Sequence, residues 1–288
     1  DYRDRHTDEY LQQPVKTMKG RAITLPKREP NPLCEDASRL IPGRLLAVAD
    51  GAGGGGLYAD LWAQYLIEHL PTEAGFANAE ALDGWLSGIW EAFYNACERQ
   101  AQQSGSFYLN KFYDEGSFST LAALWRVSPR SYYWVAYGDS VAFHYSRRQG
   151  TLSHSFGALR AFSLPPYLIN CKDELRPEGF RSGYFTVEPG DCVFVTSDAL
   201  AQYIVMMHLL TDRQTHQEEI TQLLATGLRQ SNYLRRALEL PDIDLWRDVL
   251  RPLLSCATTP RHFARHIDSL LRQGLLAPDD YSIVWSKC

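Results

Sequence analysis

Acidic residues recur in this chain at the ends of short apolar segments, and this feature restricts the fold more than any other. Residues 44–49 form an apolar run that ends at Asp50-Gly51, and residues 192–196 lead directly into Ser197-Asp198. Asp279-Asp280 stands immediately before an alternating segment over 281–286. Short runs of this kind are typical of strands. The pattern therefore predicts strands that deliver carboxylates to the ends of a sheet.

Four motifs carry these acids, in the order Cys34-Glu35-Asp36-Ala37, Asp50-Gly51-Ala52-Gly53-Gly54, Ser197-Asp198-Ala199-Leu200 and Asp279-Asp280-Tyr281-Ser282. Carboxylates that gather without basic neighbours repel one another, and a hard divalent cation with oxygen ligands relieves that repulsion. Asp50 is the natural ligand to bridge two such cations, because Gly51 lets its backbone carbonyl approach a metal closely. Asp198 and Asp279 would complete the shell of one metal, and Glu35 would help to hold the other through water.

A pair of divalent metals suits the hydrolysis of phosphate monoesters. Such a pair lowers the pKa of a bridging water and neutralises the phosphoryl oxygens. An all-oxygen ligand set favours Mg²⁺ or Mn²⁺ over zinc.

Each acidic motif also has an ordinary structural interpretation. Asp50-Gly51 is a common turn dipeptide, and Asp198 before a helical segment could be an N-cap. Asp279-Asp280 after Pro278, and Asp139 in Gly138-Asp139-Ser140, could be polar turns. The co-occurrence of the motifs favours the metal site, whereas for Asp139 both interpretations stay open.

Composition excludes several classes of protein. The chain has 288 residues, 45% of them hydrophobic, which is enough for a large core, and its net charge of −5 argues against a nucleic-acid-binding surface. No apolar run reaches the roughly 18 residues of a membrane span, and the charged start of the chain lacks a secretory signal. The six cysteines form no C-x-x-C pair, which is typical of reduced thiols in a cytoplasmic protein.

Periodicity predicts the order of the elements. Helices are expected over 57–70 and 79–103, and most of 200–274 reads as helical. The last helix of that stretch has Thr259 as its N-cap, Pro260 in its first turn and Gly274 as its stop. The expected strands are 44–49, 119–127, 131–137, 141–146 and 281–286.

Three connections are predicted less directly. Residues 137–140 are interpreted as a hairpin-like corner, and 184–187 with 192–196 as a hairpin about residues 188–191. Residues 148–183 are expected to form a long irregular excursion. The polar residues 1–19 are predicted to be an N-terminal arm, and 20–288 a single domain.

The four motifs resemble those of the metal-dependent Ser/Thr protein phosphatases of the PP2C (PPM) family, in their bacterial type. The resemblance runs from about Glu35 to the end of the chain. It implies an α+β fold, a sandwich of two antiparallel β-sheets flanked by helices on both sides. The residue string Phe118-Ser119-Thr120-Leu121 and the turn Gly138-Asp139-Ser140 also resemble family motifs.

The resemblance implies two Mn²⁺ or Mg²⁺ ions, and a third ion of the kind seen in bacterial members. It implies that the metal ligands are Glu35, Asp36, Asp50, Gly51, Asp139, Asp198 and Asp279, with Asp139 serving a third, weaker ion. Asp50, Asp198 and Asp279 would carry catalysis.

The chain departs from the family pattern at four places. Ala52 stands where some members have a histidine that acts as general acid, and Val141 replaces the usual arginine after Gly-Asp-Ser. Ala199 replaces a glycine. The phosphate-binding arginine expected upstream of Glu35 has no counterpart, since Lys27 and Arg28 are nearby but displaced.

The expected function is therefore hydrolysis of phosphoserine and phosphothreonine on proteins, by a water activated between two metals. The expected partners are a phosphorylated protein and a cognate Ser/Thr kinase, with no nucleic acid and no membrane span, in the cytoplasm. Two alternatives stay open: a catalytically inactive PP2C-like binding or regulatory module, and a metal-dependent hydrolase of a small phosphate ester. Substrate choice is expected to lie in residues 148–183 and 209–254.

Overall fold

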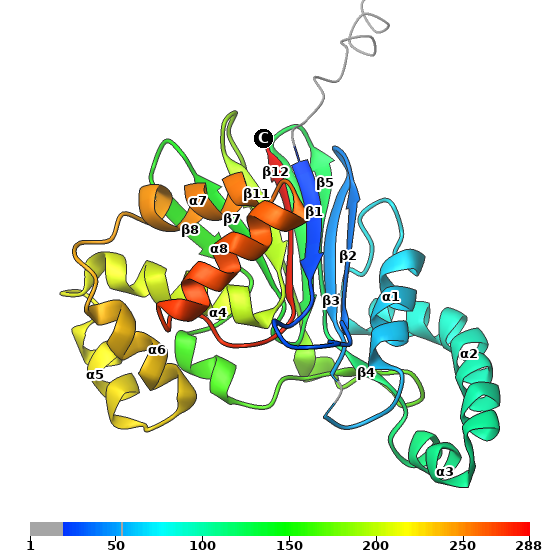
Figure 1. Ribbon diagram of the computed structural model, residues 1–288. Coiled ribbons are helices and arrows are strands. Elements are labelled where there is room, and N and C mark those ends of the chain that lie inside the picture. The colour runs from blue at the N-terminus through cyan, green and yellow to red at the C-terminus, as the bar shows by residue number, and fades with distance from the viewer. Residues whose placement is uncertain (1–19, 53) are drawn as a thin grey trace, which may run out of the picture.

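The computed structural model describes residues 20–52 and 54–288, so the predicted arm over 1–19 lies outside the described residues. Its centre is a pair of antiparallel sheets of five strands each (Figure 1). Sheet 1 has the order β1 (Gly20–Leu25), β12 (Tyr281–Lys287), β11 (Cys192–Thr196), β7 (Val141–Ser146) and β8 (Thr151–His154). Sheet 2 has the order β10 (Phe180–Thr186), β6 (Ser131–Tyr137), β5 (Leu121–Ser128), β3 (Leu45–Asp50) and β2 (Asp36–Ile41). A short pair, β4 (Phe118–Ser119) and β9 (Ile169–Asn170), lies apart from both.

The two sheets pack face to face, and strand periodicity decides which side chains lie between them. Inward positions of the central strands are apolar, because alternate residues of a strand point to opposite faces. This inner layer contains Leu46, Val48, Ala122, Leu124, Ala142, Val193, Val195 and Val284. Each central strand is apolar on its outer face as well, so both sheets need a second covering layer.

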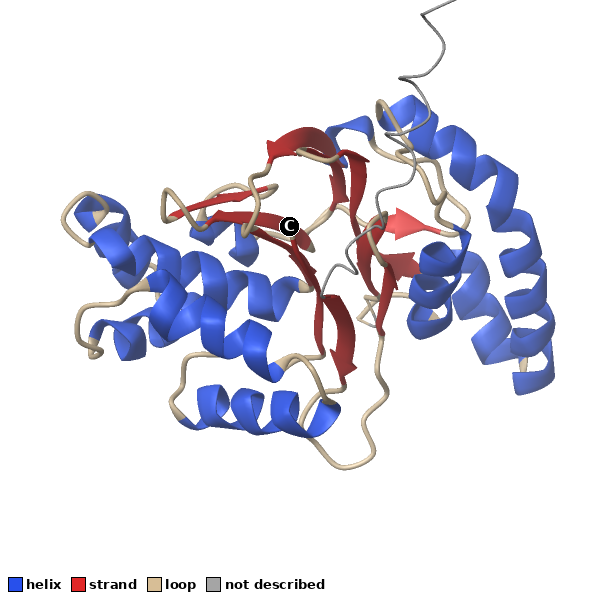
Figure 2. Cartoon of the chain, turned by 90° about the horizontal axis from the view of Figure 1, so that it is seen from above, coloured by secondary structure: helices blue, strands red, loops and turns tan. Residues whose placement is uncertain are grey.

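Helices supply that layer on both sides (Figure 2). Sheet 2 is covered by three helices, α1 (Ala59–His69), α2 (Ala79–Ser104) and α3 (Ser106–Glu115). Sheet 1 is covered by α4 (Asp198–Leu209), α5 (Gln217–Ala225), α6 (Arg229–Leu238), the π-helix η5 (Leu245–Leu250), α7 (Arg251–Cys256) and α8 (Pro260–Arg272). Short 3₁₀ turns occur at η2 (Leu159–Ser163), η3 (Pro177–Gly179) and η4 (Leu210–Asp212). The predicted α+β sandwich with helices on both sides is confirmed. No helix in the described parts of the chain is long and apolar enough to cross a membrane.

Capping residues set the helix boundaries as the sequence indicates. The side chain of Thr259 accepts a hydrogen bond from the N–H of His262, and Pro260 occupies the first helical position of α8. Gly274 follows the helix with a φ of 70°, the left-handed conformation that glycine adopts without strain. At α2, Asn78 accepts from the N–H of Ala81. These caps satisfy amide groups that would otherwise lack a partner at the helix start.

Two of the predicted connections are wrong. The third, the corner at 137–140, is present but joins two different sheets. Strands β10 and β11 do not form a hairpin, because β10 pairs with β6 in sheet 2 and β11 pairs with β7 and β12 in sheet 1. Residues 148–183 are not irregular throughout, since they contain β8 and the first part of β10. The corner at 137–140 does join β6 to β7, but it carries the chain from one sheet to the other.

The two long edges of the sandwich differ. At one edge β1 and β2 face each other, and the hydroxyls of Thr24 and Ser38 form a hydrogen bond of 2.9 Å between the sheets. At the other edge β8 and β10 are the outermost strands, and a cavity of about 570 Å³ opens between them. The sandwich is thus closed at one edge and open at the other.

Candidate metal centre

Strand ends bring the predicted acidic residues to one end of the sandwich. Asp36 opens β2 and Asp50 closes β3, and the two residues are directly paired across the strands. Asp198 follows β11 and begins α4, while Asp279 precedes β12 by two residues. Asp139 lies in the crossing between β6 and β7. Because β11 and β12 are antiparallel neighbours, the end of one strand meets the start of the other.

Gly51 is held too tightly for any side chain. Its N–H donates to the carbonyl of Glu35 at 3.0 Å. A Cβ atom at this position would lie 2.5 Å from the carbonyl oxygen of Ala59 and 2.8 Å from that of Glu35. The Asp50-Gly51 dipeptide therefore joins the first motif to the start of α1, and it is not a hairpin turn.

Hydroxyl groups fix the strand end that carries Asp50. The Oγ1 of Thr120 accepts from the N–H of Asp50 at 3.1 Å and lies 2.7 Å from the hydroxyl of Ser140. The N–H of Thr120 donates to the carbonyl of Asp50 at 2.9 Å. Two of the subsidiary motifs therefore orient the second motif and the corner that bears Asp139.

A serine pair joins the third and fourth motifs in the same way. The Oγ of Ser197 accepts from the N–H of Ser282 at 3.0 Å, and the N–H of Ser197 donates to the carbonyl of Ser282 at 3.2 Å. Asp198 does not cap the later N–H groups of α4, since its Oδ1 accepts from the adjacent N–H of Ala199 at 2.7 Å. The N-cap interpretation of Asp198 is therefore not the one that the structure supports.

Asp280 has a structural role that the sequence did not reveal. Its two carboxylate oxygens accept from the N–H of Lys27 and the N–H of Glu35, each at 2.7 Å. The carboxylate thereby ties the segment before β2 to the start of β12. The only sequence signal was the doublet Asp279-Asp280, which does not say which member is held by the backbone.

Burial and mutual repulsion raise the pKa of every aspartate of the candidate site. Burial is the largest cause throughout. It raises the pKa of Asp36 to about 7 and that of Asp139 to about 6. For Asp50 the next causes are the charges of Asp36, Asp198, Asp139 and Asp279. For Asp198 they are the charges of Asp139, Asp279 and Asp36. The five carboxylates therefore form one electrostatic group.

Asp36 is the least satisfied member of that group. The nearby hydroxyls of Ser197 and Ser282 lower its pKa. Neither carboxylate oxygen of Asp36 has a hydrogen-bond partner of good geometry among residues 20–52 and 54–288. Burying a carboxylate without donors is strongly unfavourable.

Two cations lie near the acidic group, and a third is held away from it. The charge of Lys27 lowers the pKa of Asp279, and Arg181 lowers that of Asp139. Arg181 also donates to the carbonyl of Gly138. Arg28, in contrast, makes a two-point hydrogen bond to Asp268 at 2.9 and 3.1 Å.

The arrangement is more open than a formed metal centre. In the described ranges, no three acidic, histidine or cysteine side chains lie close enough to be a ready-made ligand group. Glu35 is half-buried, and its backbone N–H and carbonyl bind Asp280 and Gly51. The donor chemistry fits a hard divalent cation, because the acids are oxygen donors at one end of the sandwich that repel one another.

Comparison with known proteins bears on the fold. No protein-family model matches the chain, and no curated protein matches it. Among solved structures, the Ser/Thr phosphatase Stp1 from Staphylococcus aureus matches over 94% of this chain and 95% of its own, with 14% identity and a TM-score of 0.52. PppA, a regulatory component of T6SS in Pseudomonas aeruginosa, matches over 95% and 98%, with 18% identity and a TM-score of 0.51. The chain has the fold of the bacterial PP2C-type phosphatases.

Proposed function

We propose that this chain, which has a PP2C-type fold, is a metal-dependent phosphatase for phosphoserine and phosphothreonine on proteins. One observation carries the proposal: five aspartates gather at one end of the sandwich, the pKa of each is raised, and neither carboxylate oxygen of the buried Asp36 has a hydrogen-bond partner among residues 20–52 and 54–288. A fold that keeps such a group needs a compensating charge from outside the chain. The likeness to a Ser/Thr phosphatase supports the choice of substrate.

The ligand set follows from where the acids lie. Asp50 would bridge two Mn²⁺ or Mg²⁺ ions, with the Gly51 carbonyl, Asp198 and Asp279 completing the shells. Glu35 and Asp36 would act at the Asp50 side, and Asp139 would serve a third ion. When bound, the metals would supply an activated water and neutralise phosphoryl oxygens.

The chain's own side chains limit the remaining chemistry. Ala52 carries no proton to give, so no side chain at this position can act as a general acid. Arg28 is occupied by Asp268, which leaves Lys27 as the basic residue before Glu35 that can face the phosphate. The Lys27 side chain is 44% exposed, and within the described residues its one ion pair is a 3.9 Å contact between the ammonium group and Glu29. Lys27 would therefore take the phosphate-binding role.

The proposal also covers the domain organisation, the compartment and the partners. Residues 20–288 would form one domain that acts in the cytoplasm on a phosphorylated protein, in opposition to a Ser/Thr kinase. The open ligand arrangement favours one alternative, a binding module without turnover, because no ready-made ligand group exists among residues 20–52 and 54–288.

The test is phosphate release from a phosphothreonine peptide with Mn²⁺, with Mg²⁺ and with EDTA. We expect release only with metal, and a fall of at least about a hundredfold in Asp50→Asn, equal to about 2.7 kcal/mol of barrier. Asp242→Asn, which changes an exposed aspartate outside the acidic group, is the matched control and should keep full activity. Tight metal binding without turnover in the folded wild type would instead establish the binding module.

A further inference from the structure

The open edge of the sandwich contains a cavity that the proposed phosphatase activity does not use. It has a volume of about 570 Å³ and lies between the edge strands β8 and β10. The acidic group lies at the ends of β3 and β11, whereas this cavity is lined by the far end of β7 and the residues before β11. The volume is within the range of small-molecule sites in proteins.

The inward positions of sheet 1 change from apolar to polar at this cavity. Ala142 of β7 faces sheet 2 within the apolar inner layer. The next inward positions are His144 and Ser146, which pair across the strands with Ser153 and Thr151 of β8. All four side chains line the cavity. An inner sheet face is normally apolar, so a polar stretch of this length points to a ligand or to bound solvent.

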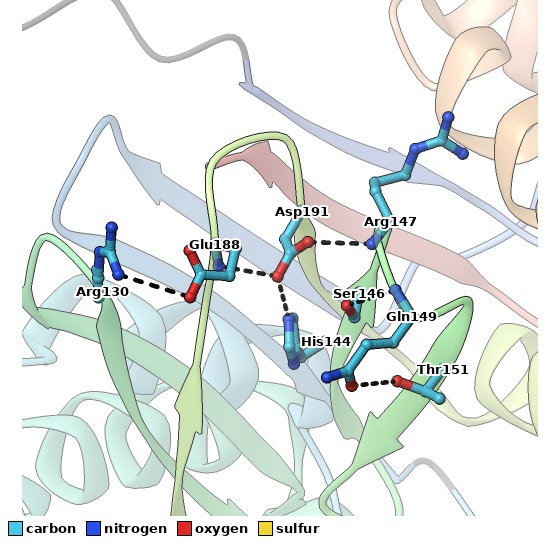
Figure 3. A network of polar contacts seen from close by, with 8 residues as sticks. All are labelled: Arg130, His144, Ser146, Arg147, Gln149, Thr151, Glu188 and Asp191. Carbon is cyan, nitrogen blue, oxygen red and sulfur yellow. Dashed lines mark hydrogen bonds and ion pairs between the residues drawn. The ribbon is translucent and has the colours of Figure 1, made fainter.

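His144 is held in a defined orientation by a buried carboxylate (Figure 3). Its Nε2 lies 2.8 Å from Oδ2 of Asp191, which is only 2% exposed. The same carboxylate accepts the N–H of Glu188 at 2.9 Å and the N–H of Arg147 at 3.0 Å. Burial raises the pKa of Asp191, but these hydrogen bonds outweigh it and the pKa is lowered overall.

The ionised Asp191 fixes the tautomer of His144. A carboxylate only accepts hydrogen bonds, so Nε2 is the ring nitrogen that donates to Asp191, and in that tautomer Nδ1 is an acceptor. Nδ1 has no hydrogen-bond partner in the part of the chain that the structure describes. The ring therefore offers an oriented acceptor to a ligand in the cavity.

The opposite wall offers an aromatic surface and a donor. A Cβ atom on Gly183 would lie 2.6 Å from the indole ring of Trp134, so only glycine lets that ring lie across the edge strand β10. The indole N–H of Trp134 has no hydrogen-bond partner among the described residues. Phe185 extends the same wall, 6.1 Å from Trp134 between ring centroids.

The charges around the cavity disfavour an anionic ligand. No lysine or arginine from residues 20–52 and 54–288 lines it. Arg130 lies 3.6 Å from Glu188, and the guanidinium of Arg147 stacks on Trp246 at 3.7 Å, away from the cavity. A phosphate or carboxylate ligand would thus meet Glu188 and Asp191 without a compensating cation.

We propose that this cavity is a second binding site, which takes an uncharged ring that carries hydroxyl groups and one apolar face. The apolar face stacks on Trp134, and the hydroxyls bridge the indole N–H on one wall and Nδ1 of His144 on the other. Ser146, Thr151 and Ser153 add hydroxyls that both donate and accept. A nucleoside and a neutral sugar share this chemistry.

The experiment is NMR titration of the ¹⁵N-labelled chain, in EDTA, with adenosine, glucose and maltose, alongside AMP and glucose 6-phosphate. We expect indole and imidazole signals to shift with at least one neutral probe, and the phosphorylated counterpart to bind at least about fivefold more weakly. Adenosine alone would identify a nucleoside site, and glucose or maltose alone a sugar site.

Matched variants locate the binding. Ser153→Val on β8 should weaken it about fivefold, the effect of one lost hydrogen bond. Ser182→Val, an exposed residue beside Gly183 that does not line the cavity, should leave it unchanged. Gly183→Ala should abolish stacking by displacing Trp134. No shift with any neutral probe, equal binding of phosphorylated probes, or equal loss in Ser182→Val would overturn the proposal.

Discussion

Asp191 and Asp36 are both buried carboxylates of this sandwich, but they differ in their hydrogen bonds and in the direction of their pKa shifts. Asp191 accepts three N–H groups from Glu188, Arg147 and His144, and its pKa is lowered overall. Asp36 is buried as well, yet neither of its oxygens has a hydrogen-bond partner in the described ranges, and its pKa is raised to about 7. The chain can therefore satisfy a buried carboxylate when the fold requires it. It does not do so for Asp36, which is the position where the proposed function places a compensating cation.

The two sites also differ in their effect on the stability of the folded protein. The Asp191 network joins the turn before β11 to the end of β7, so it contributes to the folded state without a ligand. The acidic group opposes folding, because burial and mutual repulsion disfavour its charged form, and under the proposed function a cation would relieve this cost. The two sites should consequently respond in opposite directions to mutation, to pH and to metal.

The largest expected effect is the loss of the satisfied carboxylate. Asp191→Ala leaves the N–H groups of Glu188 and Arg147 and the ring of His144 without their acceptor. We expect the free energy of unfolding to fall by about 3–5 kcal/mol, as when one partner of a buried pair is removed. Urea denaturation of the EDTA-treated protein measures this. A loss below about 1 kcal/mol would contradict the structural role of the network.

For Asp36, which has no hydrogen-bond partner in the described ranges, mutation should instead raise the free energy of unfolding. Asp36→Asn removes a buried charge, so the metal-free protein should gain about 1–3 kcal/mol in unfolding free energy. Mn²⁺ at a hundred times the Kd should stabilise the wild type by about 2.7 kcal/mol and should stabilise the variant by less. Thermal denaturation with and without Mn²⁺ checks both statements, with Asp242→Asn as control. Equal Mn²⁺ stabilisation of wild type and Asp36→Asn would argue against Asp36 as a ligand.

The same contrast predicts a pH dependence. The folded-state pKa of Asp36 is about 7, above its ordinary value of 3.8, so its contribution is present below pH 3.8 and is lost as pH rises through 7. Asp139, with a pKa of about 6, acts in the same direction. We expect these two groups to reduce the stability of the metal-free protein from pH 5 to 8, by up to about 1.4 kcal/mol per pH unit for each group.

The pH effect has its own control. Asp191 has a lowered pKa, so its contribution is lost only as pH falls through that lowered value. His154, His208 and His266 have lowered pKa values and act in the opposite direction between pH 5 and pH 8. The comparison of wild type with Asp36→Asn, by urea denaturation in EDTA at both pH values, therefore isolates the contribution of Asp36. An equal change of stability in the two proteins would refute the assignment.

The smallest expected effect concerns Lys27 and Arg28, the two adjacent basic residues before Glu35. Arg28 and Asp268 are 39% and 35% exposed, and exposed ion pairs contribute no more than about 1 kcal/mol. Arg28→Gln should leave phosphopeptide hydrolysis unchanged, whereas Lys27→Gln should raise KM more than it lowers kcat. Steady-state kinetics with one phosphopeptide compares the two, and a larger KM effect of Arg28→Gln would reverse their roles.

Sequence reasoning predicted the elements that carry a strong local signal. The apolar run before Asp50 and the glycine after it identified β3 and its acidic end, and Thr259, Pro260 and Gly274 marked α8. β8 escaped prediction because its inward residues Thr151 and Ser153 are polar, which removes the alternation that marks a half-buried strand.

Other features depend on contacts between distant segments. The sequence of the turn over 188–191 is the same whether β10 and β11 pair with each other or join different sheets. Only the packing of the whole fold decides that they join different sheets. The roles of Asp279 and Asp280 likewise could not be separated in advance, because Asp280 is held by the backbone of residues 27 and 35. The ligand roles of all the predicted acids stay predictions until metal binding is measured.

The position of β12 has a consequence for the order in which the molecule is completed. This strand follows every other described element in the sequence, yet it lies inside sheet 1 between β1 and β11. Asp279, Asp280 and Ser282, which hold or contact three of the four motifs, arrive with it. During synthesis, the acidic group therefore cannot assemble until this last strand has left the ribosome, and a chain cut before it would lose the site and the middle of the sheet together.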